Sequence, residues 1–363
     1  MIQKIGDHKI KNLDHISPSQ YHSAIRCPYK LVLANSFGYQ PLLPLNANAH
    51  YGSIIHKMIE LISKGVINDE QKFSENWIYL INKKEEELKE IGLAGITPLK
   101  YFVADFALKK NQIKNLLQKR NEKINRSTKM SSSKFYPEKR LENSDKSISG
   151  IADLIIENES GTTILDFKTG KIYSDAIDES GVIVQVVRKE YEVQLKLYAY
   201  LYFLMNGKYP KALFIVTLSN YFIEVEFETT ECEIIYSEAL NFLATTNSLI
   251  TKEDMKSIAN PSMENCRFCA YRPACGFYSN WLTTNFEAVN DLFGIIEKVN
   301  QFSNDTLGLV LQTQGKQVLI NGLSIEKKKD FESLIGKNVI LYNLKKTRQS
   351  LNATANNFTV IYE

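Results

Sequence analysis

The sequence predicts an α/β core that is preceded by helices and followed by a separate all-β domain. Residues 51–125 carry apolar side chains at helical spacing. Between residues 136 and 228, short β-type runs alternate with one patterned helix. After residue 290, five short strand-like runs follow one another. At 363 residues, of which 44% are apolar, the chain is long enough for about two domains with buried cores.

The helical part is expected to begin with a helix around residues 52–62, in which Ile55, Met58, Ile59 and Ile62 recur at core spacing. Two longer helices are expected to follow it: Glu70–Ile91, which ends at Gly92, and Leu99 to roughly Ile124, with Thr97 as N-cap and Pro98 at the first helical position. Residues 51–125 are therefore expected to form the helical part of the molecule.

A run of positive charge joins the helical part to the core. From Lys109 to Arg140 there are eleven Lys or Arg residues and two acids, Glu122 and Glu138. This segment carries a net charge of +9, so the rest of the chain carries −6. Residues 126–134 are expected to form a mobile loop. A basic run is usually a solvated helix face, but its position just before the core strands also suits a surface that follows phosphates.

The core is expected to contain two antiparallel strands joined by the turn Glu159-Ser160-Gly161. Asp153 follows Gly150-Ile151-Ala152, and Asp166 lies near the end of the second run, Thr162–Phe167. Pairing of the two strands brings the two acids close together. Because close carboxylates repel, they need a cation between them, and hard carboxylate oxygens suit Mg²⁺ or Mn²⁺.

Lys168 lies two residues beyond Asp166, so its side chain is expected on the same face of the strand. A metal ion, two acids and an ammonium group together suit the hydrolysis of a phosphodiester, because the metal activates water and the cations stabilise the developing charge. The alternative is a solvated strand face, since Asp-x-Lys is common on strands.

Two helical pairs add further candidates. His56 and Glu60 are one turn apart, and His56 suits a neutral imidazole ligand, although a lone helical histidine is more often packed or on the surface. Gln194 and Tyr198 share one face of an expected helix, Glu192–Asn206, from which both can reach DNA or the acids. The alternative for this pair is an ordinary amphipathic helix that is rich in tyrosine.

The rest of the core has three expected elements. Thr169–Lys189 is expected to be a linker beside the acids that gates access to them. Leu213–Leu218 and Tyr221–Phe227 are expected to form a hairpin, and Cys232–Leu243 a helix.

Five cysteines are present, and three of them form the pattern Cys266-x2-Cys269-x5-Cys275. This pattern is too dense for structural disulfides in a chain without an apparent signal peptide, and it predicts a metal site that lacks one ligand. All histidines lie at or before His56, so Cys27 is the better fourth ligand, whereas Cys232 is expected to pack. Four thiolates suit zinc or a [4Fe–4S] cluster, and the spacing alone does not choose between them.

The C-terminal domain is expected to contain five strands and one helix: Phe293–Val299, Leu307–Thr313, Lys316–Leu323, the helix Glu326–Ile335 closed by Gly336, Lys337–Leu344 and Asn357–Tyr362. A helix between the third and fourth strands is the order of an OB-fold barrel, which often binds single strands. The basic segment Lys345–Gln349 lies between strands four and five. The alternative is another small barrel, such as an SH3-like one, that docks a protein partner.

Several functional classes are not indicated. No stretch approaches the roughly 20 apolar residues of a membrane span, and Met1–Ile10 is polar, so we expect a cytoplasmic protein in which thiols stay reduced. No Gly-x4-Gly-Lys-[Ser/Thr] phosphate loop occurs, so we expect no nucleotide motor in this chain. The net charge of +3 does not by itself indicate nucleic-acid binding.

The order of these motifs resembles a known family. Ser17-Pro18-Ser19 and Cys27-Pro28 are followed by Gly-x3-His-x3-Glu, Gly-x2-Asp, Asp-x-Lys-Thr-Gly, Gln-x3-Tyr and Cys-x2-Cys-x5-Cys. This order, over residues 15–285, resembles the RecB-like branch of the PD-(D/E)XK nucleases that carry an iron–sulfur cluster. Examples are the CRISPR-associated RecB-like exonucleases and the AddB nuclease domain.

The resemblance implies a role for each matching residue. Metal ligands would be His56, Asp153, Asp166 and the Phe167 carbonyl; the catalytic lysine would be Lys168; the group that orients DNA or the lysine would be Gln194 and Tyr198; a further acid would be Glu138; and the [4Fe–4S] ligands would be Cys27, Cys266, Cys269 and Cys275. For Glu138 a plain surface position is the alternative. For the cysteines the resemblance favours iron–sulfur over zinc.

The resemblance also implies an architecture and a function. We expect a restriction-endonuclease-like nuclease domain over residues 1–285, followed by an OB-like barrel over 290–363. The first domain would contain a helical part (51–130), a catalytic core (135–230) and a cluster-binding segment (255–285). We expect a Mg- or Mn-dependent nuclease for single-stranded or frayed DNA, in DNA repair, recombination or anti-phage defence, with a helicase or defence protein as partner. The alternative is a non-catalytic DNA-binding or scaffold subunit of such a complex.

Overall fold

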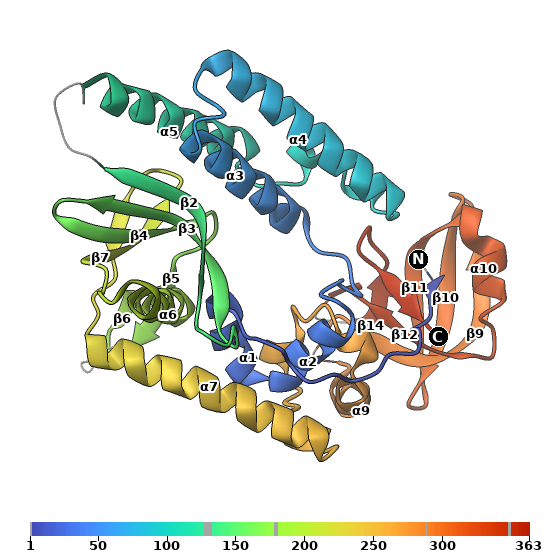
Figure 1. Ribbon diagram of the computed structural model, residues 1–363. Helices are drawn as coiled ribbons and strands as arrows, with labels where there is room; N and C mark the ends of the chain where they lie inside the picture. Colours follow the sequence, from blue (N-terminus) through green and yellow to red (C-terminus); the bar gives the residue numbers. More distant parts are fainter. Residues whose placement is uncertain (1, 127–132, 178–180, 288, 348–349) are drawn as a thin grey trace.

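The computed structural model of the protein describes residues 2–126, 133–177, 181–287, 289–347 and 350–363. Figure 1 shows a sheet with helices on both of its faces, a helical arm above it, and a second, curled sheet on the other side of the molecule. The part of the basic run expected to be a mobile loop lies largely outside the described residues.

The first part of the chain is helical. Its elements are α1 (Pro18–Arg26), α2 (Pro28–Ser36), α3 (Ala47–Ser63), α4 (Glu70–Glu90), the short 3₁₀ turns η1 (Ala94–Ile96) and η2 (Leu99–Tyr101), and α5 (Phe106–Arg126). Side chains that accept backbone N–H groups start two of these helices: Asn46 accepts from Ala49, and Asp69 accepts from Lys72. The predicted helices over residues 52–62 and 70–91 are therefore confirmed.

The third predicted helix begins later than expected. Pro98 has an extended backbone, with ψ near 136°, and precedes only the short turn η2. Asp105 then has a φ of 58°, in the left-handed region that a right-handed helix excludes. The helix therefore starts at Phe106, and the prediction of Thr97 as the N-cap and Pro98 as the first helical residue was wrong.

The central sheet has five strands in the order β2-β3-β4-β7-β8. They are β2 (Lys134–Glu142), β3 (Ser149–Asn158), β4 (Gly161–Lys168), β7 (Ala212–Thr217) and β8 (Phe222–Glu224). β3 and β4 are antiparallel, with Leu154 opposite Leu165, as their turn predicted. β4 and β7 are parallel, so a crossover connects them, and α6 (Lys189–Asn206) lies in it.

Alternate residues of the strands pack into two different hydrophobic cores. Ile155 and Ile164 pack with α1, α2, α6 and α7 (Thr229–Thr251) on one face of the sheet. Leu154 and Leu165 pack with α3, α4 and α5 on the other face. The period-2 alternation of strand side chains therefore places the sheet between two helical layers.

The segment between β4 and α6 is not the linker that we expected from the sequence. β5 (Tyr173–Ile177) and β6 (Ile183–Val187) form an antiparallel hairpin with Ser174 opposite Val186. Its second strand reads Ile-Val-Gln-Val-Val, and β-branched residues of this kind favour the extended backbone.

The C-terminal part forms an eight-stranded sheet in the order β1-β15-β12-β9-β10-β11-β14-β13. Its elements are β1 (Ile2–Gln3), β9 (Leu292–Gln301), β10 (Thr306–Thr313), β11 (Lys316–Ser324), η5 (Ile325–Lys327), α10 (Lys328–Glu332), β12 (Asn338–Tyr342), β13 (Lys345–Thr347), β14 (Ser350–Thr354) and β15 (Val360–Tyr362). The five predicted strands and the helix between the third and fourth are present, and β1, β13 and β14 are additional. Within the described residues the pairing gives a curled sheet and does not close it into a barrel.

Four short helices connect the two halves: η3 (Met255–Ser257), α8 (Met263–Cys266), η4 (Arg272–Ala274) and α9 (Gly276–Asn285). Arg272 and Asp291 form a buried ion pair, with Nε 2.7 Å from Oδ2, and Tyr278 donates to the same oxygen at 2.6 Å. This network joins the cysteine segment to the start of the C-terminal sheet. In the chain segments that the structure describes, no helix has the length and apolar character needed to cross a membrane.

Candidate functional site

The two acids come from adjacent strands of the central sheet. Asp153 on β3 and Asp166 on β4 each lie one residue beyond the Leu154–Leu165 pair, toward the same end of the ladder. Asp166 is buried, and Asp153 is partly buried and accepts the backbone N–H of Phe167 at 2.6 Å through Oδ2. The structure therefore brings these two predicted residues together and fixes the Asp153 carboxylate against β4.

Lys168 and Gln194 surround the Asp166 carboxylate. The amide of Gln194, on α6, donates to Asp166 Oδ1 at 2.9 Å and accepts from Lys168 Nζ at 3.0 Å. Lys168 Nζ also lies 2.6 Å from Asp166 Oδ2. One buried amide thus bonds to both the acid and the ammonium group.

His56 approaches the acids from the opposite helical layer. Its Nδ1 lies 3.9 Å from Asp153 Oδ1, because α3 packs on the face of the sheet that carries Leu154 and Leu165. Burial lowers the pKa of the imidazole, and Asp166 only partly opposes this effect. A neutral imidazole at this position retains the lone pair that a metal ligand requires.

Glu138 on β2 lies opposite Asp153 on β3. Its φ is 53°, and the β2–β3 register runs without a shift from the Pro137–Leu154 pair to the Lys139–Ala152 pair. Burial and then the charge of Glu60 raise the pKa of the Glu138 carboxyl. Its own charge contributes to the raised pKa of Asp153, so a third acid lies near the site.

Tyr198 forms a hydrogen bond with the strand that carries Asp153. Its buried hydroxyl donates to the backbone carbonyl of Ile151 at 2.8 Å, two residues before Asp153. A Cβ at Gly150 would lie 2.8 Å from Pro18 Cδ and 3.0 Å from the Tyr198 ring, so the close approach requires glycine. The Tyr198 hydroxyl is thus hydrogen-bonded to the backbone of the strand that carries Asp153, and not to Lys168.

The protein alone compensates the negative charges of Asp153 and Asp166 poorly. Burial, followed by the charge of Asp166, raises the pKa of Asp153 to about 8. Burial also raises the pKa of Asp166, although Lys168 opposes the shift. Asp166 Oδ2 is buried and forms an ion pair with Lys168 at 2.6 Å, but within the described part of the chain it has no well-aligned hydrogen-bond donor. A buried orphan acceptor beside a second carboxylate and a neutral imidazole fits a hard divalent cation.

The side chains nevertheless do not form a closed coordination sphere. Among the residues that the structure describes, no group of three or more His, Cys, Asp or Glu side chains is arranged to hold a metal ion. The 3.9 Å separation of His56 Nδ1 and Asp153 Oδ1 is within the about 4.2 Å that two ligands of one Mg²⁺ can span, so this pair alone leaves the coordination sphere open.

The raised pKa of Asp153 predicts a pH-dependent stability of the metal-free protein. The folded pKa of about 8 exceeds the ordinary value of 3.8, so the folded state binds more protons between these two pH values. Stability is therefore expected to fall as pH rises through this window. Melting temperatures in a chelator between about pH 5 and 9 should fall more steeply for the wild type than for Asp153→Asn. Equal pH slopes in the two proteins would contradict the assignment.

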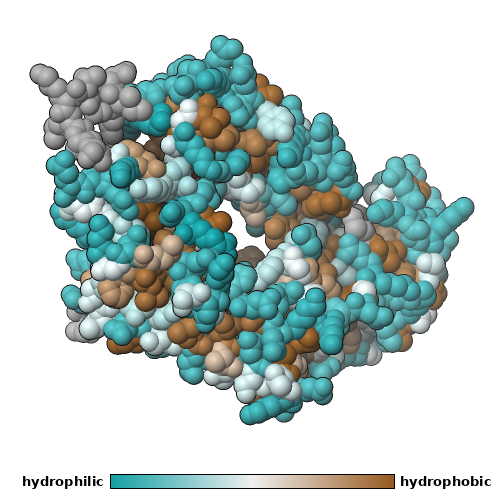
Figure 2. Space-filling model, viewed as in Figure 1, coloured by the Kyte–Doolittle hydropathy of each residue, from teal (hydrophilic) through white to brown (hydrophobic). Residues whose placement is uncertain are grey.

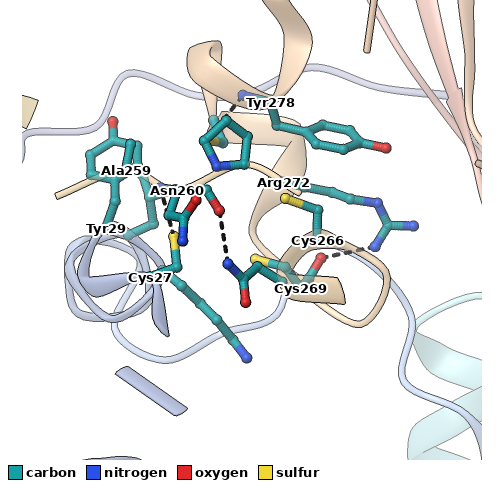
Figure 3. A pocket seen from close by; sticks show the side chains of 13 residues that line it. Cys27, Tyr29, Ala259, Asn260, Cys266, Cys269, Arg272 and Tyr278 are labelled. Carbon is teal, nitrogen blue, oxygen red and sulfur yellow. Dashed lines mark hydrogen bonds between the residues drawn. The ribbon is translucent and has the colours of Figure 1, made fainter. Parts of the chain in front are cut away.

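The cysteines form a second candidate site. Cys27, between α1 and α2, lines one pocket with Cys266, Cys269 and Cys275 from the segment that contains α8 and η4. Figure 3 shows the sulfur atoms of Cys27, Cys266 and Cys269 directed toward the same space. Cys232 instead lies on α7, with its side chain buried in the core. The structure thus brings together the four cysteines that were predicted as ligands.

The chemistry of the four thiols fits a soft metal. Burial raises the pKa of Cys266 to about 11 and that of Cys275 to about 12, so these thiols stay protonated unless a metal displaces the proton. The enclosed space is only ≈20 Å³, about that of one water molecule. In their described positions the thiols are not arranged to hold an ion, so either an ion or a larger cluster requires these side chains to turn.

Comparison with known proteins agrees with the arrangement of the acids. The profile of the PD-(D/E)XK nuclease superfamily matches residues 15–276, which is well over half of the chain. The chain belongs to the PD-(D/E)XK nuclease superfamily. The matched region includes both acids, Lys168, Gln194 and all five cysteines. The eight-stranded sheet lies entirely outside it, because β1 precedes the region and the other strands follow it.

Two solved structures are similar to this nuclease-superfamily chain. One is a candidate exonuclease from Eubacterium rectale, with 12% identity and a TM-score of 0.38, covering 74% of this chain and 88% of that one. The other is the protein SSO0001, with 13% identity and a TM-score of 0.24, covering 74% of this chain and 89% of that one. No curated protein sequence matches the chain. Family membership therefore rests on the profile match.

One residue next to the site was not predicted. The ring of Tyr191 lies beside Lys168, with its centroid 4.6 Å from Nζ. Tyr191 and Gln194 are three positions apart on α6, which places them on one face of the helix. This spacing is the feature of the sequence from which the position of Tyr191 near the site could have been predicted.

Proposed function

We propose that this nuclease-superfamily protein is a Mg²⁺- or Mn²⁺-dependent deoxyribonuclease that acts on single-stranded or frayed DNA ends. The observation that carries the proposal is the Asp153–Asp166 pair, with Gln194 holding both Asp166 and Lys168. Two acids with raised pKa values and one orphan oxygen are costly in the apoprotein and are stabilised by a divalent cation.

Each side chain then has a distinct task. Asp153, Asp166 and His56 hold the cation, together with the Phe167 carbonyl that the family resemblance adds. When bound, the cation supplies Lewis-acid activation of water and of the phosphate. Lys168 stabilises negative charge on the phosphate, Gln194 keeps its ammonium group in place, and Tyr198 holds the strand that carries Asp153. Glu138, opposite Asp153 on β2, is available to bind a proton or a second ion at the rim.

The shape of the molecule supports a single-stranded substrate. Figure 2 shows an opening that passes through the molecule. In Figure 1 it lies between α3, the β2–β3 hairpin, and α1 with α2. Residues 37–46 run from α2 to α3 along its right-hand side. The opening is thus bordered by the elements that carry His56 and Asp153, and a strand enters such a closed opening by a free end.

The test compares two forms of one DNA. A linear oligonucleotide of defined sequence is expected to be cut in the presence of Mg²⁺ or Mn²⁺, and the same oligonucleotide after ligation into a circle is expected to resist. End labels on the linear strand report the polarity of cleavage. No metal-dependent cleavage of the linear strand would favour the alternative, a non-catalytic DNA-binding or scaffold subunit. Equal cleavage of both forms would support nuclease activity but would contradict the proposal that the strand enters by a free end.

We also propose that the four cysteines hold a [4Fe–4S] cluster, with zinc as the alternative. Their convergence from positions 27 and 266–275 supports a four-thiolate site, and the resemblance to iron–sulfur nucleases favours the cluster. Reduced thiols suit a cytoplasmic protein. The pathway would be DNA repair, recombination or anti-phage defence.

For residues 290–363 we propose an OB-like domain that binds single-stranded DNA or docks a helicase or defence protein. The parallel pairing of β11 with β14 and the antiparallel pairing of β9 with β12 support the OB-like order. Lys346, in the basic segment between the fourth and fifth predicted strands, donates to the carbonyls of Phe286, Val289 and Asp291. Arg348 lies outside the described residues. Among the described residues of this loop, Lys345 is exposed and available for DNA, while the bonds of Lys346 support protein docking as the alternative.

A further inference from the structure

Three groups surround the ammonium of Lys168. Asp166 Oδ2 lies at 2.6 Å, the Gln194 amide oxygen at 3.0 Å, and the centroid of the Tyr191 ring at 4.6 Å. The first two belong to the acid site. The third is an aromatic face, which attracts a cation through its quadrupole.

The Tyr191 ring is fixed in its position. The residue lies in the first turn of α6 and packs against the core beneath the central sheet. Its hydroxyl donates to the carbonyl of Lys171 at 3.3 Å. Lys171 is three residues after Lys168, so the ring bridges α6 to the segment that leaves β4. The ring orientation is thus set by the chain next to the lysine that it contacts.

The three contacts differ in what they do when a cation is bound. Under the proposed function, Asp166 turns to the metal and is lost as a partner of Lys168. The Gln194 amide must then serve both the acid and the ammonium group. The Tyr191 face has no proton acceptor and no charge, so it holds the ammonium group without neutralising it. The charge of Lys168 therefore remains available to the phosphate.

We propose that Tyr191 is a positioning residue, whose ring keeps the Lys168 ammonium at the scissile phosphate once Asp166 has turned to the metal. This proposal rests on the nuclease function proposed above. It assigns the aromatic ring, and not the hydroxyl, as the working part of the side chain.

The test uses two substitutions of the same residue. Tyr191→Phe keeps the ring, and its kcat on the linear strand is expected within about twofold of the wild type. Tyr191→Leu removes the ring, and its kcat is expected to fall roughly tenfold with KM changed less than about twofold, because binding is preserved and only the charge at the transition state is misplaced. The Mg²⁺ concentration for half-maximal rate should be unchanged in both.

Two matched controls separate this role from general packing. Tyr200, also partly buried on α6, packs its ring 4.6 Å from that of Tyr236, and Tyr200→Leu should leave kcat unchanged. Arg188 also lies over the Tyr191 ring, at 5.8 Å, and is paired with Glu190 at 2.8 Å. Arg188→Ala should therefore leave kcat within about twofold of the wild type. A loss in Arg188→Ala equal to that in Tyr191→Leu would show that the ring serves the arginine and would overturn the proposal.

An NMR measurement tests the contact between the Tyr191 ring and Lys168 independently of enzymatic activity. In protein with ¹³C-labelled lysine, the ε-protons of Lys168, assigned by their loss in Lys168→Arg, should show an upfield ring-current shift in the wild type and Tyr191→Phe but not in Tyr191→Leu. Equal shifts in all three, full kcat in Tyr191→Leu, or equal losses in the two Tyr191 variants would overturn the proposal. If the wild type cleaves no DNA, the proposed function fails and so does the catalytic role, while the shift still shows whether the ring contacts Lys168.

Discussion

Asp166→Asn is expected to abolish DNA cleavage while leaving the metal-free protein at least as stable as the wild type. The asparagine keeps the size of the side chain but lacks the negative charge that holds a cation, which should cost at least ~3 kcal/mol of barrier, or roughly 10²-fold in rate. In the metal-free fold the same charge is buried beside Asp153, and its raised pKa shows that the fold disfavours it. The substitution should therefore separate activity from stability.

Lys168→Ala is expected to produce a similar loss of rate by a different route. It removes the ammonium group that faces the phosphate, while the acids remain available to the cation. Lys171→Ala is the matched control, because Lys171 lies on the same segment and is exposed. The measurement is metal-dependent cleavage of an end-labelled strand, together with thermal unfolding. Wild-type turnover in Asp166→Asn or Lys168→Ala would rule out this site.

Cys27→Ser is expected to remove the bound metal and to lower stability more than it affects the chemistry of cleavage. Cys27 and Cys266 lie 239 positions apart, so a shared metal closes a very long loop and ties the α1–α2 hairpin to the cysteine segment. A serine hydroxyl is a poor ligand for the soft metals that thiolates bind. Loss of the metal should release that hairpin and lower solubility and melting temperature.

The fifth cysteine provides the control for this experiment. Cys232 is fully buried and away from the pocket, so Cys232→Ala should keep the metal and change only local packing. Visible absorbance with a brown colour identifies an iron–sulfur cluster, whereas colourless protein with one equivalent of zinc identifies the alternative. Full metal content and full stability in Cys27→Ser would reject Cys27 as a ligand.

The acid site was largely predictable from the sequence, because its geometry is local. A short turn joins β3 to β4, and the pairing across that turn brings Asp153 and Asp166 together. Strand alternation then places Lys168 beside Asp166. Helix periodicity placed Gln194 on α6, although the helix begins three residues earlier than predicted. In each case the residues that meet are neighbours in the chain or follow a fixed repeat.

Other features depend on distant contacts, and there the predictions were wrong or incomplete. Glu138 comes opposite Asp153 only through the register of β2 with β3, and Tyr198 donates to the Ile151 carbonyl of a distant strand. The expected linker after Lys168 is an exception to this rule, because it pairs locally with itself as a hairpin. The N-terminal residues Ile2–Gln3 join β15 at the other end of the chain.

The sequence alone therefore determined most of the elements, the candidate acids and lysine, and the group of cysteines, because these follow from short-range pairing and from spacing along the chain. The tertiary structure decided how these elements meet. Packing of α3 on the sheet brings His56 to Asp153, and the buried Arg272–Asp291 pair anchors the cysteine segment to the C-terminal sheet. It also places the Tyr191 ring on Lys168. These contacts join segments whose separation in the chain carries no repeat, so only the energy of the folded core selects them.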